Sequence, residues 1–183
     1  MKVLSRGEAI SPNRDELPEI ARRNVRYADP ASWVVATAVA RTIKGCAIDI
    51  GTIKDETGLI SISATGPSET MLAVSQATKD GYSSALRFPA ASPSTVAGVS
   101  CVAFGLKGPT LNLTMQCAEG VTVSLHLIEY WLQHRGVPNV FLATSCEAAQ
   151  FGVRARCALF GLPSTAFDSP VYSVDDTALW LSL

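Results

Sequence analysis

The hydrophobic pattern of the chain changes period several times, and the helical period is clearest after Asp29. Asp29 can cap a helix and Pro30 suits the first helical position, while apolar side chains follow three and four residues apart up to a stop at Gly45. The same spacing predicts helices at residues 68–80, 96–104, 121–134 and 151–162.

Alternating or continuous apolar runs predict the strands. In residues 110–115, Leu111, Leu113 and Met115 alternate with polar residues, which is strand periodicity. Residues 140–145 form a continuous apolar run, as buried parallel strands do. Extended structure is also predicted at 47–51, 58–64 and 171–183, and residues 1–26 are predicted to be a poorly specified lead with one short strand. This order of strands and helices predicts an α/β protein whose sheet is covered on both faces.

Composition narrows the function classes. The 183 residues suit one domain, and 48% of them are hydrophobic against 17% charged, which indicates that part of the surface faces a partner. The net charge of −1 argues against nucleic acid and against an anionic membrane as partners. Five widely spaced cysteines without a C-x-x-C pair indicate reduced thiols in a cytoplasm, with neither a disulfide framework nor a metal site. Neither a signal peptide nor a membrane span is expected from the hydropathy.

Cys117 is the candidate for chemistry. It lies between the predicted strand at 110–115 and the predicted helix at 121–134, where a side chain is poorly covered by its own backbone. Free N–H groups and the positive dipole end at a helix start favour a thiolate or a nearby oxyanion. Cysteine is also among the most buried residue types, so plain packing is the alternative role.

Several motifs occur in the order and spacing of a known enzyme family. They are GLISISATG at 58–66, RFP at 87–89, FGLKGPT at 104–110, CAEG at 117–120, and VFLA at 140–143 followed by Glu147. In this order they resemble the N-terminal half of β-ketoacyl synthases, over about residues 27–183. The strongest element of the resemblance is the FGLKGP turn followed by a strand and a Cys-Ala-x-Gly.

The resemblance implies a thiolase-like half domain at 27–183, behind the lead at 1–26: a layered α/β/α unit with a mixed, mostly parallel sheet. Family members contain two such halves. The cysteine at the position of Cys117 accepts an acyl group from an acyl carrier protein in the family, and two histidines of the second half complete the site without any cofactor. The two histidines of this chain, His126 and His134, lie in the helix after Cys117 and match neither position. We expect both to serve structural roles, His126 on a partly buried side of its helix.

Two residues beside Cys117 depart from the family pattern. Gln116 is larger than the small residue that usually precedes the cysteine, and Glu119 replaces a small hydroxyl residue. A carboxylate two residues from a thiol raises the pKa of that thiol by charge repulsion. Met115, Gln116 and Glu119 are therefore expected to line the acyl pocket without making Cys117 a good nucleophile.

These observations favour an accessory, non-condensing subunit of a type II polyketide or fatty-acid synthase. Like a chain-length factor, it would pair with a complete ketosynthase, or with itself, and shape the acyl tunnel beside an acyl carrier protein. The predicted dimer interface is the edge strand of Thr110, Leu111, Asn112, Leu113, Thr114 and Met115, because an unpaired apolar edge invites pairing.

Two alternatives remain. One is acyl transfer or thioester hydrolysis through Cys117, and the other is a split ketosynthase whose Cys-His-His set is completed by another chain. Glu147 is expected to be a hydrogen-bonding anchor, and the four other cysteines are expected to fill the core. Five arginines could attract an acidic carrier protein, namely Arg22, Arg23, Arg26, Arg154 and Arg156.

Overall fold

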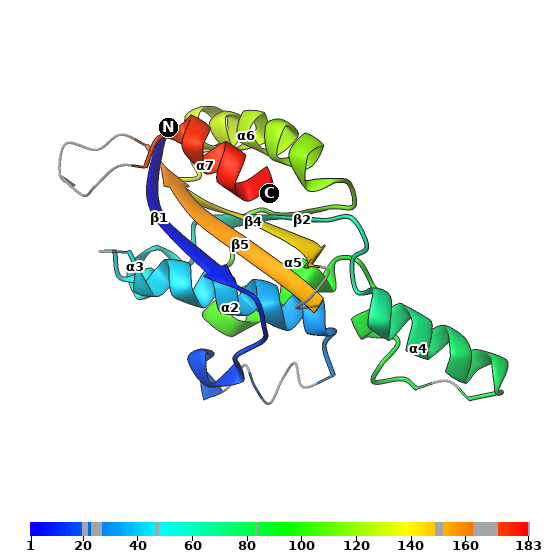
Figure 1. Cartoon of the computed structure of the whole chain (residues 1–183). Helices are drawn as coiled ribbons and strands as arrows, with labels where there is room; N and C mark the ends of the chain where they lie inside the picture. Colours follow the sequence, from blue (N-terminus) through cyan, green and yellow to red (C-terminus); the bar gives the residue numbers. More distant parts are fainter. Residues whose placement is uncertain are drawn as a thin grey trace.

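The described residues build one five-stranded sheet in the order β1-β5-β4-β2-β3 (Figure 1). The computed structural model describes residues 1–19, 22, 27–46, 48–82, 84–148, 152–162 and 172–182. The strands are β1 (Lys2–Ala9), β2 (Thr57–Ser63), β3 (Thr110–Leu113), β4 (Asn139–Ala148) and β5 (Gly152–Gly161). β2 pairs in parallel with both β3 and β4, whereas β5 runs antiparallel to β4 and β1, so the sheet is mixed, as predicted, with two parallel and two antiparallel pairings.

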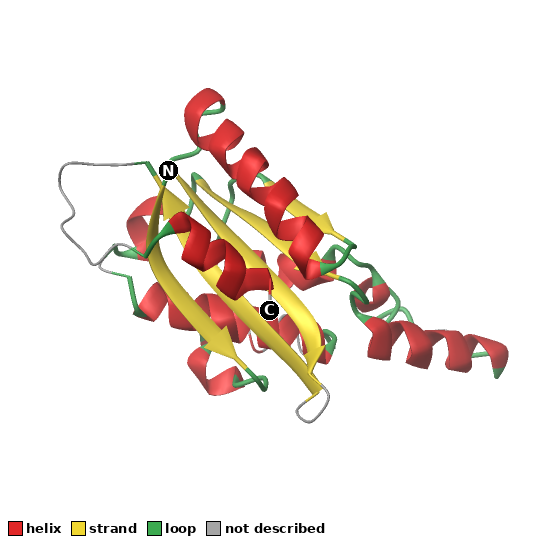
Figure 2. Cartoon of the chain, turned by 45° about the horizontal axis from the view of Figure 1, so that its top comes forward, coloured by secondary structure: helices red, strands yellow, loops and turns green. Residues whose placement is uncertain are grey.

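Helices cover both faces of the sheet (Figures 1 and 2). The helices are α2 (Pro30–Lys44), α3 (Ile50–Ile53), α4 (Ser68–Lys79), α5 (Thr95–Phe104), α6 (Cys117–His134) and α7 (Val174–Ser182), with two 3-10 turns at Arg14–Glu16 and Pro89–Ala91. α2 and α5 lie on one face, and α6 and α7 lie on the other (Figure 1). The layered α/β/α architecture expected from the resemblance is therefore confirmed.

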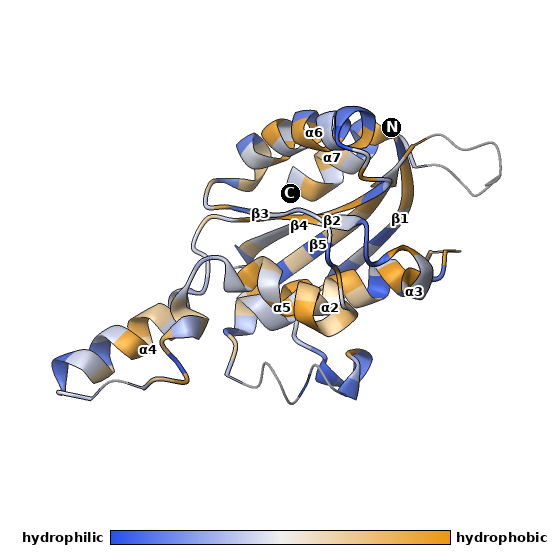
Figure 3. Cartoon of the chain, turned by 180° about the vertical axis from the view of Figure 1, so that it is seen from behind, coloured by the Kyte–Doolittle hydropathy of each residue, from blue (hydrophilic) through white to orange (hydrophobic). Residues whose placement is uncertain are grey.

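The central strands are buried on both faces. Phe141 and Ala143 of β4 pack into the cluster shared with α2 and α5, whereas Val140 and Leu142 pack into the cluster shared with α6 and α7. All seven residues of β2 are buried. Figure 3 shows hydrophobic colour on α2 and α5 beside the sheet, which matches a continuous apolar strand pattern between two helical layers.

The secondary structure predicted for two segments near the C-terminus was wrong. Gly152–Gly161 is strand β5, where the sequence predicted a helix from 151 to 162. Arg154 and Arg156 alternate with Ala155 and Cys157 at the period of two that defines a strand, and both arginines reach Glu8 of β1. Residue 151 lies outside the described residues.

Val174–Ser182 is helix α7, where a strand was predicted over 171–183. The Ser173 side chain accepts a hydrogen bond from the Asp176 amide at 3.3 Å, and the first turn is acidic, so the helix has a start signal that the apolar run at its end obscured. Residues 171 and 183 are outside the described residues.

Smaller differences concern element ends. Ile50–Ile53 is a short helix capped by Asp49, not the extended segment predicted at 47–51, of which residue 47 lies outside the described ranges. β3 ends at Leu113 and α6 begins at Cys117, so the predicted strand was two residues too long and the helix begins four residues earlier than predicted. β1 is a full eight-residue strand paired with β5. A domain boundary at residue 26 stays a prediction.

Candidate functional site

Two adjoining cavities lie where β2 and β4 end and α6 begins. One, of about 390 Å³, is lined by Ala64, Thr65, Gln116, Cys117, Ala118, Ser145, Cys146, Glu147 and Ser182. The other, of about 330 Å³, shares Thr65, Ser145, Cys146 and Glu147 with the first. The carboxyl ends of parallel strands meet at this edge, which is where open α/β sheets bind ligands. This position makes the two cavities the candidate site.

Cys117 is the first residue of α6, and its side chain is only 9% exposed. Its thiol donates a hydrogen bond to the Ser145 carbonyl oxygen at 3.6 Å. The neighbouring Cys146 thiol, together with burial, raises the pKa of Cys117 well above its usual range. The expected direction was right, but the expected cause was wrong: the causes are Cys146 and burial, and Glu119 is exposed.

Cys146 is the functional candidate that the sequence analysis missed, because it was expected to be core filler. It is half-buried on β4 and lines both cavities. The hydrogen bond from Cys117, followed by the positive charges of Arg156 and Arg154, lowers the pKa of Cys146 to about 6. The signal in the sequence was a second cysteine between the strand predicted at 140–145 and Glu147.

The two thiols compete for the negative charge. The α6 N-terminus favours a thiolate on Cys117, whereas the arginines favour one on Cys146. Cys117 faces a carbonyl oxygen, which repels a thiolate and accepts from a thiol, so we assign the proton to Cys117 and the charge to Cys146. The three other cysteines were also expected to fill the core, and their burial agrees with that. Cys157 is fully buried, and Cys46 and Cys101 are half-buried against the α2 side of the core.

The three residues expected to line an acyl pocket are placed differently. Gln116 lines the 390 Å³ cavity, Met115 packs against the α6 side of the core, and Glu119 is exposed in the first turn of α6. The structure therefore brings Gln116 and Cys117 together at the cavity, whereas Met115 and Glu119 are not among the residues that line it.

The predicted interface strand lies at the end of the sheet. β3 pairs with β2, and among the described strands none lies on its other side. Leu111, Leu113 and Met115 are half-buried toward α6, while Thr110 and Thr114 are exposed, Thr114 lying beyond the strand end. The Ser61 hydroxyl donates to the Asn112 side chain at 2.5 Å, which fixes the register of β3 on β2.

Three expected supporting roles are altered by the structure. His126 is exposed, with Nδ1 2.8 Å from the Thr122 carbonyl oxygen, so the expectation that it is partly buried was wrong. His134 is exposed at the end of α6 beside Tyr130. Glu147 is exposed at the cavity mouth, and its carboxylate has no hydrogen bond to the residues that the structure describes. Neither histidine is among the residues that line the two cavities.

The described arginines of the expected basic patch are already paired. Arg22 lies 3.2 Å from Asp15, and Arg154 and Arg156 lie 3.4 Å and 3.0 Å from Glu8. Arg156 also donates to the Trp180 carbonyl oxygen. Arg23 and Arg26 lie outside the described residues. In the described ranges, no group of three His, Cys, Asp or Glu side chains is arranged to hold a metal ion.

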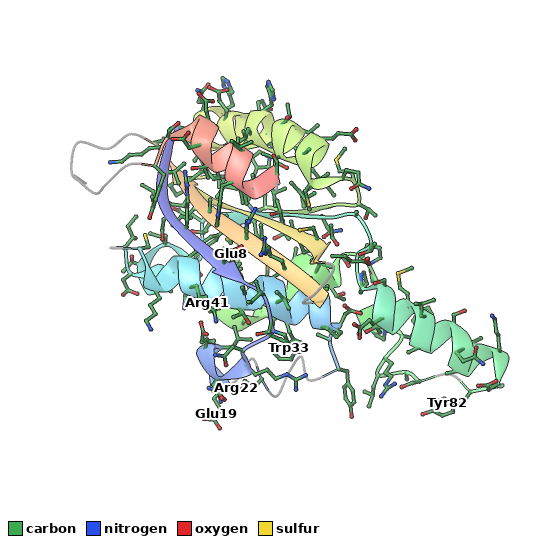
Figure 4. All side chains as sticks on the ribbon, viewed as in Figure 1. Glu8, Glu19, Arg22, Trp33, Arg41 and Tyr82 are labelled. Atoms are coloured by element: carbon green, nitrogen blue, oxygen red, sulfur yellow. The ribbon has the colours of Figure 1, made fainter. Side chains whose placement is uncertain are left out.

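The helix predicted at 68–80 is present as α4, but its projection from the rest of the molecule was not predicted. We call α4 and the described residues that follow it, 80–82 and 84–88, the apolar arm. α4 projects away from the sheet and its helices, with Tyr82 at the outer part of the arm (Figures 1 and 4). No residue of α4 is buried. Its large apolar side chains and those of the following segment are exposed: Met71 (45%), Leu72 (71%), Tyr82 (64%), Leu86 (61%) and Phe88 (66%). So many apolar side chains in one exposed region indicate a surface that contacts another molecule.

Comparisons with known proteins define the fold. No protein-family model matches the sequence, and no curated protein is similar to it. Solved structures do match. A chain of the ketosynthase ApeO in complex with its chain length factor ApeC from Xenorhabdus doucetiae is similar, with a TM-score of 0.64 and 10% identity, over 89% of this chain and 79% of that chain.

Two other structures are similar to the same degree. The ishigamide ketosynthase/chain length factor matches with a TM-score of 0.64 and 13% identity over 93% of this chain and 64% of that chain. A β-ketoacyl synthase from Burkholderia phymatum STM815 matches with a TM-score of 0.64 and 13% identity over 87% and 53% of the two chains. This chain thus spans between about half and two-thirds of these two proteins.

The chain therefore has the thiolase-like fold of ketosynthases and chain length factors, as the sequence motifs predicted. In the described part, no helix is both long and apolar enough to cross a bilayer.

Proposed function

We propose that this chain is an accessory, non-condensing subunit of a type II polyketide or fatty-acid synthase that pairs with a complete ketosynthase. It contributes to the acyl tunnel of the pair, as a chain-length factor does. The observation that carries the proposal is an open β3 edge together with an exposed apolar arm on a ketosynthase-like fold. Two of the similar structures contain ketosynthase and chain length factor components, which supports a partner of that class.

The cavity chemistry is consistent with a role other than condensation. A decarboxylative condensation needs a reactive thiol and donors for an oxyanion and an enolate. The pKa of Cys117 is raised by Cys146 and by burial, which lowers its thiolate fraction. The two histidines are exposed on α6 and line neither cavity. Catalysis by the pair is accordingly assigned to the partner.

The outer face of α6 bears on the split-ketosynthase alternative. Glu119, Thr122, His126, Glu129 and Gln133 are all exposed there. A second α/β half packed on this face would bury two carboxylates, which is costly unless each one finds a partner. α2, by contrast, is buried almost all round between the sheet and α5. Val123 and Tyr130 are exposed on α6 as well, so this surface is mixed, and it is the two carboxylates that weigh against a second half packed on it.

The test is co-expression of the tagged chain with the complete ketosynthase encoded nearest to it, followed by native mass spectrometry of the purified product. We expect a stoichiometric complex of the two chains. Recovery of a homodimer without ketosynthase would favour self-pairing over the heterodimer. Recovery of a monomer with no bound ketosynthase would overturn both forms of pairing.

Matched variants locate the interface on the arm. Leu72→Glu and Phe88→Glu each remove an exposed apolar side chain of the arm, and Leu179→Glu removes one of similar exposure (65%) from α7. Burying such a side chain contributes about 1.5–3 kcal/mol, so each arm variant should weaken pairing about tenfold or more. Leu179→Glu should leave it unchanged. Equal effects at all three positions would contradict docking through the arm.

A second pair of variants tests the β3 edge. The Leu59 amide donates to the Pro109 carbonyl oxygen at 3.0 Å, and in a parallel ladder this register turns the Asn112 N–H away from β2. Asn112→Pro removes that outward donor, whereas Asn112→Ala keeps it and loses only the side-chain bond to Ser61. Pairing should be lost in the proline variant and retained in the alanine variant. Retained pairing in both would argue against strand addition at β3.

The acyl-transfer alternative has its own assay. Incubation with an acyl-CoA should leave an acyl adduct on the intact protein if Cys117 is acylated, and Cys117→Ala should abolish that adduct. Our proposal predicts no adduct on Cys117 in the isolated chain. An adduct that depends on Cys117 would instead make the chain an acyltransferase.

A further inference from the structure

Two thiols from different elements meet inside the 390 Å³ cavity. Cys117 begins α6 and Cys146 lies near the end of β4. The Cys117 sulfur is 3.6 Å from the Ser145 carbonyl oxygen, which belongs to the peptide group that joins Ser145 to Cys146. Both side chains line the same cavity, and each thiol shifts the pKa of the other. Neither packing nor the proposed pairing explains why the cavity holds two adjacent thiols.

The other three cysteines have different neighbours. The Cys101 sulfur contacts the Thr110 hydroxyl at 3.4 Å, and the Cys46 sulfur accepts from the Ile48 amide at 3.5 Å. Cys157 is fully buried, and its carbonyl oxygen accepts a hydrogen bond from the Thr42 hydroxyl at 3.0 Å. The Cys117–Cys146 arrangement differs from them because both of its thiols line the 390 Å³ cavity, whose lining contains none of the other three cysteines.

We propose that Cys117 and Cys146 form a reactive dithiol that closes to an intramolecular disulfide on reaction with a low-molecular-weight disulfide such as glutathione disulfide. Cys146 is the attacking thiol and Cys117 is the resolving thiol. The inference does not rest on the proposed function, because it needs only the two sulfur atoms and the cavity that admits the reagent.

The roles follow from access and charge. Cys146 is half-buried and lines both cavities, whereas Cys117 is 9% exposed and lines one. Arg156 and Arg154 lie near enough to Cys146 to stabilise a thiolate, and the side chain of Arg156 is only 11% exposed, so its charge is weakly screened. Glu8, which pairs with both arginines, opposes this effect without cancelling it.

The reaction balances in two exchange steps. The Cys146 thiolate attacks one sulfur of glutathione disulfide, forming a mixed disulfide and releasing one glutathione thiolate. Cys117 then loses its proton to the released thiolate and attacks the Cys146 sulfur. This second step forms the Cys117–Cys146 bond and releases the second glutathione as a thiolate, which takes its proton from water. Two protein thiols are oxidised and one glutathione disulfide is reduced to two thiols.

The bond would join the first residue of α6 to the end of β4, across the cavity that Gln116 and Ser145 also line. Its formation removes the Cys117 donor from the Ser145 carbonyl oxygen and replaces two polar groups by an apolar bridge. The oxidation state of the pair thus determines the shape and polarity of the candidate site.

The experiment equilibrates the whole chain in glutathione buffers of graded oxidising strength, followed by alkylation with N-ethylmaleimide, intact mass measurement and peptide mapping. We expect two of the five cysteines to become unavailable to the reagent together, with Cys117 and Cys146 in one disulfide-linked peptide, fully reversed by excess dithiothreitol. Five alkylated cysteines under all conditions, or a different linked pair, would overturn the proposal.

Single variants separate the two roles. Cys117→Ser should accumulate a glutathione adduct on Cys146, because no resolving thiol remains, and Cys146→Ser should form neither adduct nor disulfide. Cys101→Ser, which removes another half-buried cysteine, should still form the Cys117–Cys146 bond. A Cys117 adduct in Cys146→Ser that forms as fast as the Cys146 adduct in Cys117→Ser would reject Cys146 as the attacking thiol.

The pH dependence of the reaction rate is a separate test, because a variant that merely folds less well would not change it. Since the pKa of Cys146 is lowered to about 6, the rate at which Cys146 forms the mixed disulfide should change little between pH 7 and 8 and fall about tenfold per pH unit well below pH 6. A rate that rises about tenfold between pH 7 and 8 would indicate an ordinary thiol and contradict the assignment.

Discussion

One buried carboxylate caps two helices, and its removal gives the sharpest test of how the arm is attached. Asp29 is 2% exposed; its Oδ1 accepts from the Ala31 amide at 2.9 Å, which caps α2, and its Oδ2 accepts from the Thr70 amide at 2.8 Å, in the first turn of α4. The residue preceding α4, Pro67, makes no side-chain capping bond. Asp29 therefore supplies from a distance the acceptor that α4 lacks locally.

The expected loss in the free energy of unfolding follows from the two hydrogen bonds that Asp29 accepts. Loss of a helix cap costs about 0.5–2 kcal/mol, and loss of a hydrogen bond to a charged group costs about 1.5–3 kcal/mol. Asp29→Ala loses both, so the free energy of unfolding should fall by about 2–5 kcal/mol. Asp29→Ser keeps the α2 cap but cannot reach Thr70, so it should lose only about 1.5–3 kcal/mol.

Urea unfolding followed by far-UV circular dichroism measures both losses, and native-state hydrogen exchange locates them. Exchange in α4 should speed up in both variants, whereas exchange at the start of α2 should speed up only in Asp29→Ala. The reasoning is refuted if Asp29→Ser is as stable as the wild type, or if α4 amides exchange at unchanged rates in both variants.

The remaining predictions concern packing and titration. A Cβ at Gly108 would lie 2.5 Å from the Thr57 carbonyl carbon and oxygen, so Gly108→Ala should cost about 2–3 kcal/mol in thermal or urea unfolding. Gly98, inside α5, has no atom within 4 Å of such a Cβ, so Gly98→Ala should stabilise by about 0.5–1 kcal/mol, and a loss there would contradict the packing described for α5. Burial raises the pKa of Cys157 to about 12; the unfolded thiol ionises first, so the contribution of Cys157 to stability should fall above about pH 9 by about 1.4 kcal/mol per pH unit. Cys157→Ala should flatten that decline, and an unchanged pH profile would refute it.

Local sequence predicted the helices and strands whose apolar and polar pattern matches the way they are buried in the fold. Asp29 and Pro30 start α2, and the continuous apolar run of β4 fits a strand covered on both faces. β5 was mistaken for a helix because Arg154 and Arg156 lie in a central strand, where their charges are tolerated only because Glu8 of β1 and the Trp180 carbonyl accept them. That compensation comes from residues distant in sequence, and local periodicity cannot show it.

The sequence singled out Cys117 and the turn before it, but not the neighbouring Cys146. The strand-to-helix turn predicted before Cys117 is present, and the structure shows a cavity beside it. Cys146 lies on a separate strand, β4, 29 positions later in the chain, and the packing of α6 on β4 brings it beside Cys117. The arm was missed for a similar reason, since the helical period of α4 predicts a buried stripe, whereas the helix projects from the body.

Hydrogen exchange of the assembled complex tests pairing through the arm and the edge strand most directly. When the ketosynthase is added, amides of Ser68–Lys79 and of residues 84–88, together with the outward amides of Thr110 and Asn112, should become protected, while the outer face of α6 should be unchanged. Protection confined to α6, with the arm and β3 exchanging as in the isolated chain, would contradict the account.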